Sequence, residues 1–360
     1  MTRILHVIPG LTGGGAERQL TLLSAAQAAR GDDVHIAVIR PEIPPQLAGT
    51  GVHVHVLRVA SHLDPGIYLR LRSLIRSTRA EVVQTWLTLS DITGGAAAYM
   101  ANVPWVLSER SMIEAYPRNW KHSARARIAK RAGAVVANSR GGVEYWQAQG
   151  IPTDRITEIP NAVDLHAIQN AVSEPLPETL DNRPLVLFVG RLAAEKNLFV
   201  MVDALAEALH GTNAVALLCG TGPLEDEIEN RIETLGASEH ILLTGHRSDI
   251  AGLMNRASLC LAVSKFEGSP NVVLEAMAAG CPLVVSDIAA YRQLLDEEST
   301  LFVPLTDVAA IARAVRSVLD NPAAAQLRAK HARVRIKAFT PEHVATALDA
   351  VYRKLVYANQ

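Results

Sequence analysis

Residues 264–280 read SKFEGSPNVVLEAMAAG, and this stretch decides how the second half of the chain folds. The pattern predicts the end of a strand, a tight glycine turn and then a helix. Ser269 is the expected N-cap residue, and Pro270 stands at the first helical position, where its missing N–H group costs nothing. The N–H groups at this helix start, around Ser269, Asn271 and Val272, therefore predict a phosphate-binding site.

Two carboxylates flank the predicted phosphate site. Glu267 precedes the helix, and Glu275 lies about 7–8 Å along the helix axis from Pro270. One carboxylate can therefore reach beyond each end of a diphosphate, which is the layout of a nucleoside diphosphate sugar: ribose, two phosphates, sugar. The simpler alternative is a buried strand–helix junction with two solvated glutamates.

The composition fits a two-domain α/β protein. The chain has 360 residues, and 49% of them are hydrophobic, which is enough for two separate cores. The net charge of −1 gives no sign of a nucleic-acid partner. Cys219, Cys260 and Cys281 stand in apolar runs and predict reduced, buried thiols in a cytoplasmic protein. The first residues predict a strand rather than a signal peptide, and no apolar run is long enough to span a membrane.

Strand and helix patterns alternate through both halves of the chain. This alternation predicts two doubly wound Rossmann-like domains with a cleft between them. We expect the first domain over residues 1–172, a linker rich in Pro, Glu and Asp over 173–184, and the second domain over 185–340.

A glycine-rich turn, Gly10 to Gly15, follows the first predicted strand and precedes a helix. Such a turn predicts contact with a phosphate or a sugar, with a plain tight turn as the alternative. The turn lacks the G-x-G-x-x-G spacing, and Asp33 precedes the second strand instead of ending it. A dinucleotide-dependent oxidoreductase is therefore disfavoured.

Gly190, Arg191 and Lys196 follow the first strand of the second half. Arginine offers a planar two-point grip and lysine a point charge, so the pair predicts a diphosphate clamp ahead of a helix. The alternative is a salt bridge with Glu195 at the helix start. The chain has no Asp-x-Asp motif to hold a divalent metal, so we predict neither a metal nor a cofactor.

These motifs resemble those of the retaining glycosyltransferases of family 4, which have the GT-B fold of two Rossmann-like domains facing a central cleft. The family's Glu-x7-Glu signature matches Glu267 and Glu275, and its Gly-Arg-x4-Lys element matches the segment from Gly190 to Lys196. The resemblance implies that Glu275 binds the ribose and that Glu267 lies by the donor sugar. Arg191 and Lys196 would then neutralise the diphosphate.

The same resemblance covers nearly the whole chain and assigns further residues. The turn before the first helix fits the family's Gly-Gly-x-Glu element near donor and acceptor: Gly14, Gly15 and Glu17. A strand end in the second half is implied to hold the nucleotide base: Gly245, His246 and Arg247. In the GT-B fold the last helix, here within 341–360, packs on the first domain.

The strand that ends at Leu107 is followed by Ser-Glu-Arg-Ser, and ligands of open α/β sheets gather at such strand ends. The resemblance implies that Glu109 faces the reacting sugar and that Arg110 lies on the acceptor side. The family often has a histidine here, and this chain has none. An ordinary ion pair between Glu109 and Arg110 is the alternative.

Residues 118–131 form a strongly basic segment without an acid. On a helix, Trp120, Ala124 and Ile128 share one face, so the segment predicts a basic amphipathic helix on an anionic membrane surface, each cation adding ~1 kcal/mol. A solvated helix face is the alternative. Nucleic acid is less favoured, because no stacking aromatics interleave the charges.

The predicted function is transfer of a sugar from a nucleoside diphosphate sugar to an acceptor hydroxyl, with UDP favoured and GDP as the alternative. Retention at the anomeric carbon is what the family resemblance implies. We expect a lipid-linked or cell-surface glycan precursor as acceptor, at the inner face of a bacterial membrane. The alternatives are a sugar-nucleotide epimerase of GT-B fold, which fits the Glu-x7-Glu stretch less well, and a nucleotide-sugar binding protein without turnover.

Overall fold

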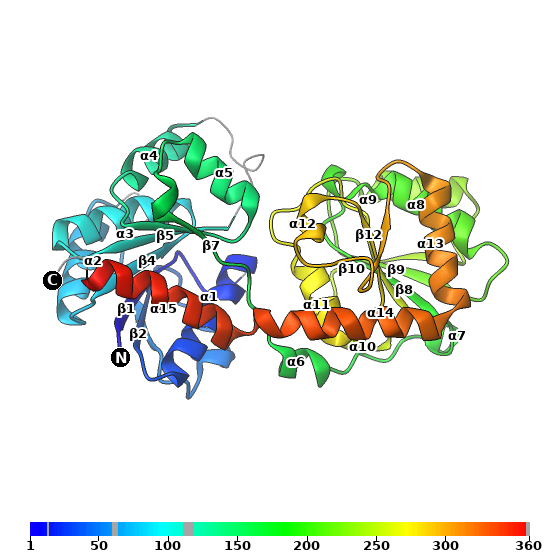
Figure 1. The fold of residues 1–360 in the computed structure, drawn as a ribbon, viewed down its shortest axis with the longest axis horizontal. Helices are drawn as coiled ribbons and strands as arrows, with labels where there is room; N and C mark the ends of the chain where they lie inside the picture. The colour runs from blue at the N-terminus through cyan, green and yellow to red at the C-terminus, as the bar shows by residue number, and fades with distance from the viewer. Residues whose placement is uncertain (13, 60–63, 111–118, 358–360) are drawn as a thin grey trace. The chain divides into compact units, whose positions relative to one another are not determined.

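The computed structural model describes residues 1–12, 14–59, 64–110 and 119–357. The chain forms two compact units (Figure 1). Unit 1 comprises Met1–Ala162 and Phe339–Gln360, and unit 2 comprises Val163–Ala338. Each unit has a parallel β-sheet with helices on its faces, as the alternation of strand and helix patterns predicts.

Unit 1 is built on a seven-stranded parallel sheet within the described residues, in the order β3-β2-β1-β4-β5-β6-β7. The order reverses between β1 and β4, so the carboxyl ends of these strands form the edge where ligands of such sheets bind. The strands are β1 (Arg3–Val7), β2 (Asp33–Val38), β3 (His53–Val56), β4 (Val82–Trp86), β5 (Trp105–Glu109), β6 (Ala134–Ala137) and β7 (Ile156–Glu158).

Helices cover both faces of this sheet (Figure 1). Because successive side chains of a strand point to opposite faces, Ile4 and Leu5 of β1 belong to different hydrophobic clusters. The cluster with Ile4 includes α1 and α15, and the cluster with Leu5 includes α2, α3, α4 and α5. The helical elements are α1 (Gly15–Ala29), η1 (Pro45–Leu47), α2 (Gly66–Ser77), α3 (Thr88–Ala101), α4 (Trp120–Ala129), α5 (Arg140–Ala148), η3 (Thr153–Arg155) and α15 (Pro341–Tyr357).

The carboxyl-terminal helix α15 belongs to unit 1, after the short turn η5 (Ile336–Phe339). Tyr352 of α15 is fully buried, and its hydroxyl donates a hydrogen bond to Gln84 of β4. The same hydroxyl accepts a hydrogen bond of 3.3 Å from Gln27 of α1. This buried tyrosine therefore ties the last helix to α1 and to β4, the strand that pairs with β1.

Unit 2 has a six-stranded parallel sheet among the residues described, in the order β10-β9-β8-β11-β12-β13. Helices α8 and α13 pack against each other and bury Val186 and Phe188 of β8. The strands are β8 (Leu185–Val189), β9 (Val215–Cys219), β10 (Ile241–Gly245), β11 (Leu259–Ala262), β12 (Leu283–Ser286) and β13 (Leu301–Val303). The helical elements are α6 (Leu165–Gln169), α7 (Glu178–Asp181), η4 (Ala194–Lys196), α8 (Leu198–Leu209), α9 (Glu225–Thr234), α10 (Ile250–Arg256), α11 (Asn271–Ala279), α12 (Ala289–Arg292), α13 (Val308–Asp320) and α14 (Pro322–Arg335).

The unit boundary falls after Ala162, earlier than the boundary after residue 172 that the sequence predicts. The reason is α6, whose Ile168 carbonyl accepts a 2.8 Å hydrogen bond from Asn255 of unit 2. The expected linker 173–184 is anchored in the same way, because Arg183 donates to the carbonyl of Asn213 at 2.7 Å. The composition of residues 173–184 predicts an interdomain linker, and the structure places this segment within unit 2.

Candidate active site

Helix α11 begins at the turn that the sequence singles out, one residue later than predicted. Pro270 occupies the N-cap position with φ −81° and ψ 79°, and no side chain caps the helix, so the prediction that Ser269 is the N-cap is wrong. The carbonyl of Ser269 instead accepts the N–H group of Asn271 at 2.9 Å, which tightens the turn. Gly280 ends the helix in the left-handed conformation, as expected. The helix start therefore faces outward without a side-chain cap, which suits an anion.

Lys196 and Glu267 meet beside this helix start. The Lys196 Nζ atom lies 2.6 Å from Glu267 Oε1, and Ser264 Oγ donates to the same oxygen at 2.7 Å. Both charged side chains are largely buried, at 17% and 16% exposed. Asn197 fixes the direction of the lysine, since it adopts φ 59° and donates to the Leu305 carbonyl at 2.7 Å. A cation and a carboxylate are thus held in contact beside the first turn of α11.

Tyr291 completes the surroundings of Glu267, with its hydroxyl 3.5 Å from Glu267 Oε1. Burial and the negative charge of Glu267 raise the pKa of Tyr291, so the phenol stays protonated and donates. A cavity of about 180 Å³ opens at this point. Its polar lining consists of Lys196, Ser264, Glu267, Ser269, Asn271 and Tyr291.

A second cavity, of about 360 Å³, lies at the carboxyl ends of β8, β9 and β10. Val189 lines both cavities, so they adjoin at the end of β8. The residues around the second cavity include Gly190, Arg191, Gly220, Thr221, His246 and Arg247. Together the two cavities hold most of the donor-side residues that the sequence predicts.

Gly190 and Gly220 form the close backbone contact that shapes the second cavity. Gly220 has φ 144°, and a Cβ atom added to it would lie 1.9 Å from the Gly190 carbonyl oxygen. Gly245 has φ 65° at a break in the β9–β10 register, and its carbonyl accepts the Gly220 N–H group at 2.8 Å. Gly220 needs glycine because the two backbones approach too closely for a side chain, whereas Gly245 favours glycine because of its positive φ.

The two arginines that line the second cavity differ in how firmly they are paired with a carboxylate. Arg191 is 68% exposed and pairs with Glu195 at 2.8 Å, which is the salt bridge that the sequence offers as the alternative to a diphosphate clamp. An exposed pair of this kind is weak and exchanges readily for a ligand. Arg247 instead donates two hydrogen bonds to Asp249, at 2.8 and 2.6 Å, and lowers the pKa of that carboxyl.

Glu275 is half-buried on α11 and lies outside the lining of both cavities. The negative charge of Glu275 adds to burial in raising the pKa of the Cys260 thiol to about 12. Glu275 therefore lies near β11, the strand that carries Cys260. The structure therefore brings Glu267 and Lys196 together but keeps Glu275 apart from them. All three cysteines are buried and free, as predicted.

In unit 1, the glycine turn leads directly into α1. Gly15 is the first helical residue, and the Glu17 carboxylate folds back over Gly14. A Cβ atom added to Gly14 would lie 2.7 Å from Glu17 Oε2. Glu17 is nearly buried, so the turn holds its carboxylate in one place beside the end of β1.

Glu109 is buried and does not occupy the position that the sequence predicts for it. Its Oε2 atom accepts hydrogen bonds of 2.9 Å from both Arg125 and Trp146. Arg125 is 1% exposed, and its Nε atom also pairs with Asp91 at 2.6 Å. The predicted contact of Glu109 with the reacting sugar and its alternative, an ion pair with Arg110, both give way to a buried triad of Asp91, Arg125 and Glu109.

The burial of Arg125 also changes the predicted amphipathic helix. Arg125 and Ala129 form the buried face of α4, whereas Trp120 is 62% exposed. The predicted apolar face of Trp120, Ala124 and Ile128 is wrong, since the pairing with two carboxylates draws an arginine inward. Residues 111–118, the first of which ends the predicted Ser-Glu-Arg-Ser run, lie outside the described residues.

Arg110 follows β5 and lies over the indole ring of Trp86, with its Cζ atom 4.6 Å from the ring centroid. Its Nη1 atom donates to Asn161 Oδ1 at 2.8 Å. Its Nε and Nη2 atoms are shielded from solvent and have no hydrogen-bond partner in the described part of the chain, and the same holds for Asn138 Oδ1. Burial lowers the pKa of Arg110 to about 10, which still leaves it charged at neutral pH.

This polar group gathers at four neighbouring strand ends. Trp86 ends β4, Arg110 follows β5, Asn138 follows β6, and Asn161 comes shortly after β7. Parallel order brings these strand ends to one edge of the sheet. Unpaired N–H groups next to an unpaired carbonyl oxygen can take a ligand that offers both an oxyanion and a hydroxyl group.

Sequence reasoning missed Asp91, Tyr291 and Asn138 as parts of these surroundings. Asp91 stands in a helix whose small residues give no hint of a charge partner, and Tyr291 follows the next strand after α11. Asn138 was the one with a visible signal, because it comes directly after a buried strand.

Two family models match the two halves of the chain. The model described as Glycosyltransferase Family 4 matches residues 13–167, and the model described as Glycosyl transferases group 1 matches residues 175–335. The lipopolysaccharide core biosynthesis mannosyltransferase LpcC of Rhizobium leguminosarum bv. viciae is 30% identical over 67% of this chain and 70% of its own length. The chain therefore belongs to the group 1 glycosyltransferases, and the predicted transferase class is confirmed.

A glycogen synthase of Mycobacterium tuberculosis is 28% identical over 97% of this chain and 94% of its own length. Among solved structures, HepE of Anabaena in complex with UDP and glucose has a TM-score of 0.81 at 18% identity, covering 99% of this chain and 100% of that one. This likeness confirms the predicted GT-B fold.

The described residues contain neither a metal-binding cluster nor a membrane-spanning helix. No group of three or more His, Cys, Asp or Glu side chains there could hold a metal ion. No helix in that part of the chain combines the length and the apolar character needed to cross a bilayer.

Proposed function

We propose that the protein transfers a sugar from a nucleoside diphosphate sugar, with UDP as the favoured nucleotide, to an acceptor hydroxyl, with retention and without a metal ion. The observation that carries this proposal is the 2.6 Å contact of Lys196 with Glu267 at the uncapped start of α11. A cation and a helix start serve the diphosphate, and the carboxylate serves the sugar next to it. That HepE, similar in fold, was solved with UDP and glucose supports the choice of nucleotide.

In the proposed reaction, the bond between the anomeric carbon and the diphosphate oxygen breaks while the acceptor oxygen bonds to the same face of that carbon. The acceptor's proton passes to the departing diphosphate oxygen, so no separate base is needed. Negative charge grows on the diphosphate as it leaves. Lys196, Arg191 and the first-turn N–H groups of α11 are arranged to stabilise that charge.

Glu267 has a different role in this proposal. Its carboxylate accepts from Ser264 and Tyr291, which hold it in place whether or not Lys196 stays with it. When a diphosphate draws Lys196 away, Glu267 remains a fixed hydrogen-bond acceptor for a hydroxyl of the donor sugar. Glu275, further along α11, is proposed to bind the ribose hydroxyls, and the cavity at His246 the base.

The acceptor is proposed to be a lipid-linked or cell-surface glycan precursor. LpcC is named for lipopolysaccharide core biosynthesis, which supports a surface glycan. In unit 1, Arg110 with its unpaired Nε and Nη2 atoms is proposed to bind an oxygen of the acceptor. The turn of Gly14, Gly15 and Glu17 is proposed to lie near the reacting groups.

Contact with an anionic membrane surface is also proposed, through the exposed residues of α4 and the turn after it. Trp120, Lys121, Arg127 and Arg131 are exposed there, while Arg125 is not available. A cation on this surface adds ~1 kcal/mol when the lipid is anionic. Cytoplasmic location at the inner face of the membrane would follow from that contact.

Calorimetry with UDP, GDP and ADP on the wild type and on Glu275→Ala tests the donor assignment. We expect UDP to bind most tightly and Glu275→Ala to weaken it by about tenfold, the loss of one to two hydrogen bonds to a charged group. Equal binding of UDP by both proteins would refute the ribose role. Proton NMR of the product fixes the anomeric configuration, and turnover in excess chelator tests the independence from metal.

A further inference from the structure

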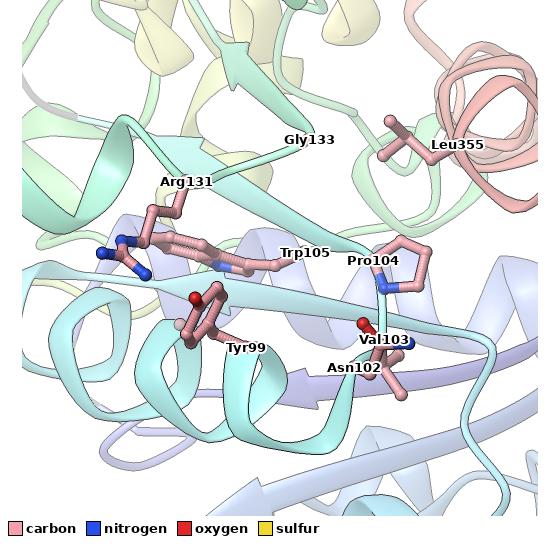
Figure 2. Close-up of a pocket in the computed structure, with 9 residues that line it drawn as sticks. Tyr99, Asn102, Val103, Pro104, Trp105, Arg131, Gly133 and Leu355 are labelled. Carbon is pink, nitrogen blue, oxygen red and sulfur yellow. The ribbon is translucent and has the colours of Figure 1, made fainter. Parts of the chain in front are cut away.

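A third cavity lies in unit 1, at the edge of the sheet opposite to the strand ends that carry Arg110. It has a volume of about 330 Å³ and opens at the amino end of β5 (Figure 2). β5 runs from Trp105, which lines this cavity, to Glu109, which precedes Arg110, a span of about 13 Å. The cavity is therefore separate from the proposed acceptor site.

The polar part of the cavity is an arginine stacked on a tyrosine. The Cζ atom of Arg131 lies 4.4 Å from the centroid of the Tyr99 ring, and Tyr99 is 62% exposed. Stacking fixes the plane of the guanidinium but leaves its N–H edges free. In the described residues no ion pair or side-chain hydrogen bond of Arg131 occupies those edges. Such an edge binds two oxygens of a phosphate or a carboxylate.

The rest of the lining is mainly apolar. Val103, Pro104 and Leu355 lie on the side of the cavity away from Arg131 and Tyr99, as Figure 2 shows. A Cβ atom added to Gly133 would lie 2.8 Å from a methyl group of Leu355, so glycine at this position keeps the wall close without closing it. A ligand that fits has an anionic group at one end and carbon-bound hydrogens at the other.

The charges around the cavity favour an anion. Helix α4 has no acidic residue, and Lys130 is exposed next to Arg131. The one acid of α3, Asp91, is buried against Arg125 and cannot offset the surface cations. The local potential is therefore positive although the whole chain is near neutrality.

We propose that this cavity binds a phosphate group through Arg131, with Tyr99 holding the guanidinium in position. The phosphate belongs either to a free phosphorylated metabolite or to a phospholipid head group. Phosphate is favoured over carboxylate because its additional oxygens can also serve the Tyr99 hydroxyl, which lines the cavity on the same side as Arg131. The site needs no sugar transfer to function, so it can be tested apart from the proposed reaction.

The experiment uses the indole N–H resonance of Trp105 as a local reporter, since the chain has only four tryptophans. Glycerol 1-phosphate is added to the nitrogen-15-labelled full chain, and the Trp105 resonance is assigned from its loss in Trp105→Phe. We expect a saturable shift of this resonance with a millimolar dissociation constant. Arg131→Ala should weaken binding at least about tenfold, the value of a charge-assisted pair of hydrogen bonds.

Two controls separate the pocket from general surface charge. Arg76→Ala removes an exposed cation of α2 that neither lines the cavity nor belongs to the proposed membrane surface, and it should leave binding within about twofold. Tyr99→Leu removes the stacked ring and should weaken binding, whereas Tyr99→Phe should retain most of it. The tyrosine variants keep the test valid if Arg131→Ala does not fold.

Vesicles of phosphatidylcholine with and without phosphatidylglycerol distinguish the two sources of phosphate. Arg131-dependent binding of glycerol 1-phosphate alone supports a free metabolite, and Arg131-dependent sedimentation with the anionic vesicles supports a head group. The proposal is overturned if neither ligand distinguishes Arg131→Ala from Arg76→Ala. A shift that persists in Arg131→Ala would likewise show that the anion binds elsewhere.

Discussion

Lys196 and Glu267 lie 2.6 Å apart although 71 residues separate them in the chain. The contact follows from the sheet order, because β11 pairs directly with β8. Lys196 stands in the turn after β8 and Glu267 in the turn after β11, so neighbouring strands deliver a cation and a carboxylate to one point. The pair also means that removing either charge alters the surroundings of the other.

Lys196→Ala should lower kcat by about 100- to 1,000-fold, because the diphosphate then leaves without its nearest cation. The affinity for UDP should fall as well, by about tenfold. Initial rates and calorimetry measure the two effects. Lys265→Ala removes an exposed lysine in the same loop region and should leave both values unchanged. A Lys196→Ala enzyme with normal kcat would exclude the lysine from leaving-group stabilisation.

Glu267→Gln should separate the sugar from the nucleotide. The amide still accepts from Ser264 and Tyr291 but carries no charge, so we expect turnover to fall by about 100-fold and UDP affinity to stay within about threefold. Activity assays with calorimetry on the same protein test this. If UDP affinity fell as much as turnover, the carboxylate would act on the nucleotide rather than on the sugar.

Gly220→Ala should disrupt the donor side through the backbone alone. The added Cβ atom would lie 1.9 Å from the Gly190 carbonyl oxygen, so one of the two turns must move. We expect a loss of more than about 2 kcal/mol in the free energy of unfolding and weaker UDP binding. Gly141→Ala is the matched control, because nothing lies within 4 Å of a Cβ atom there. Equal urea midpoints for the two variants would contradict the steric argument.

The sequence was sufficient for the fold and for the strand ends and turns that surround the two cavities of unit 2. Hydrophobic runs separated by glycine turns predict the two parallel sheets, and short spacings predict the turn at α11 and the Arg191–Lys196 element. These features are local, since each lies within a few residues of one strand end. The exact helix start was missed, because Pro270 suits either the N-cap or the first helical position.

The proposed acceptor side could not be predicted in the same way. Arg125 pairs with Asp91, which is 34 residues away in the chain, and with Glu109, which is 16 residues away. No local sequence pattern marks an arginine as buried. A periodicity argument counts every arginine as exposed and so turned α4 the wrong way. The unpaired atoms of Arg110 likewise depend on Trp86 and Asn161, which only the sheet order brings near.

Asp91 should make stability depend on pH in an unusual direction. Asp91 and Glu109 share one buried arginine, and burial raises the pKa of Asp91 from 3.8 to about 6. The folded state then holds the proton more tightly than the unfolded state. The contribution of Asp91 to stability is full below about pH 4 and is lost as the pH rises through about 6, a change of about 3 kcal/mol.

Asp91→Asn should remove this dependence and leave the protein at least as stable at pH 7, because the amide keeps the hydrogen bond from Thr85 without the excess charge. Urea unfolding at several pH values between 4 and 7 measures it. Arg125→Met is the contrasting variant, and it should cost about 3–5 kcal/mol by leaving two buried carboxylates unpaired. Parallel pH profiles for the wild type and Asp91→Asn would refute the assignment.

His6 should make stability depend on pH in the opposite direction to Asp91, over the same pH range. It is fully buried, and burial lowers its pKa from 6.5 to about 4 even though Gln27 hydrogen-bonds to it. The unfolded state therefore takes up the proton first as the pH falls, so stability is lost between about pH 6.5 and 4, by about 3 kcal/mol. His6→Gln should lose this acid sensitivity at some cost at neutral pH. An unchanged acid limb in urea unfolding would show that His6 does not govern it.

Replacing Arg110 should raise the stability of the protein and weaken its binding of the acceptor. Its Nε and Nη2 atoms are shielded from water and unpaired among the described residues, which costs folding free energy unless a ligand supplies the missing acceptor. Arg110→Met keeps the packing on Trp86 and removes the charge. We expect the variant to be more stable by about 1–3 kcal/mol and to have a much higher KM for the acceptor.

Hydrolysis of the donor in the absence of acceptor should be unchanged, because Arg110 has no part in donor binding. Arg110→Lys keeps the charge without the planar fork and should recover only part of the acceptor affinity. Lower stability of Arg110→Met together with a normal acceptor KM would mean that the arginine serves the fold and not the substrate.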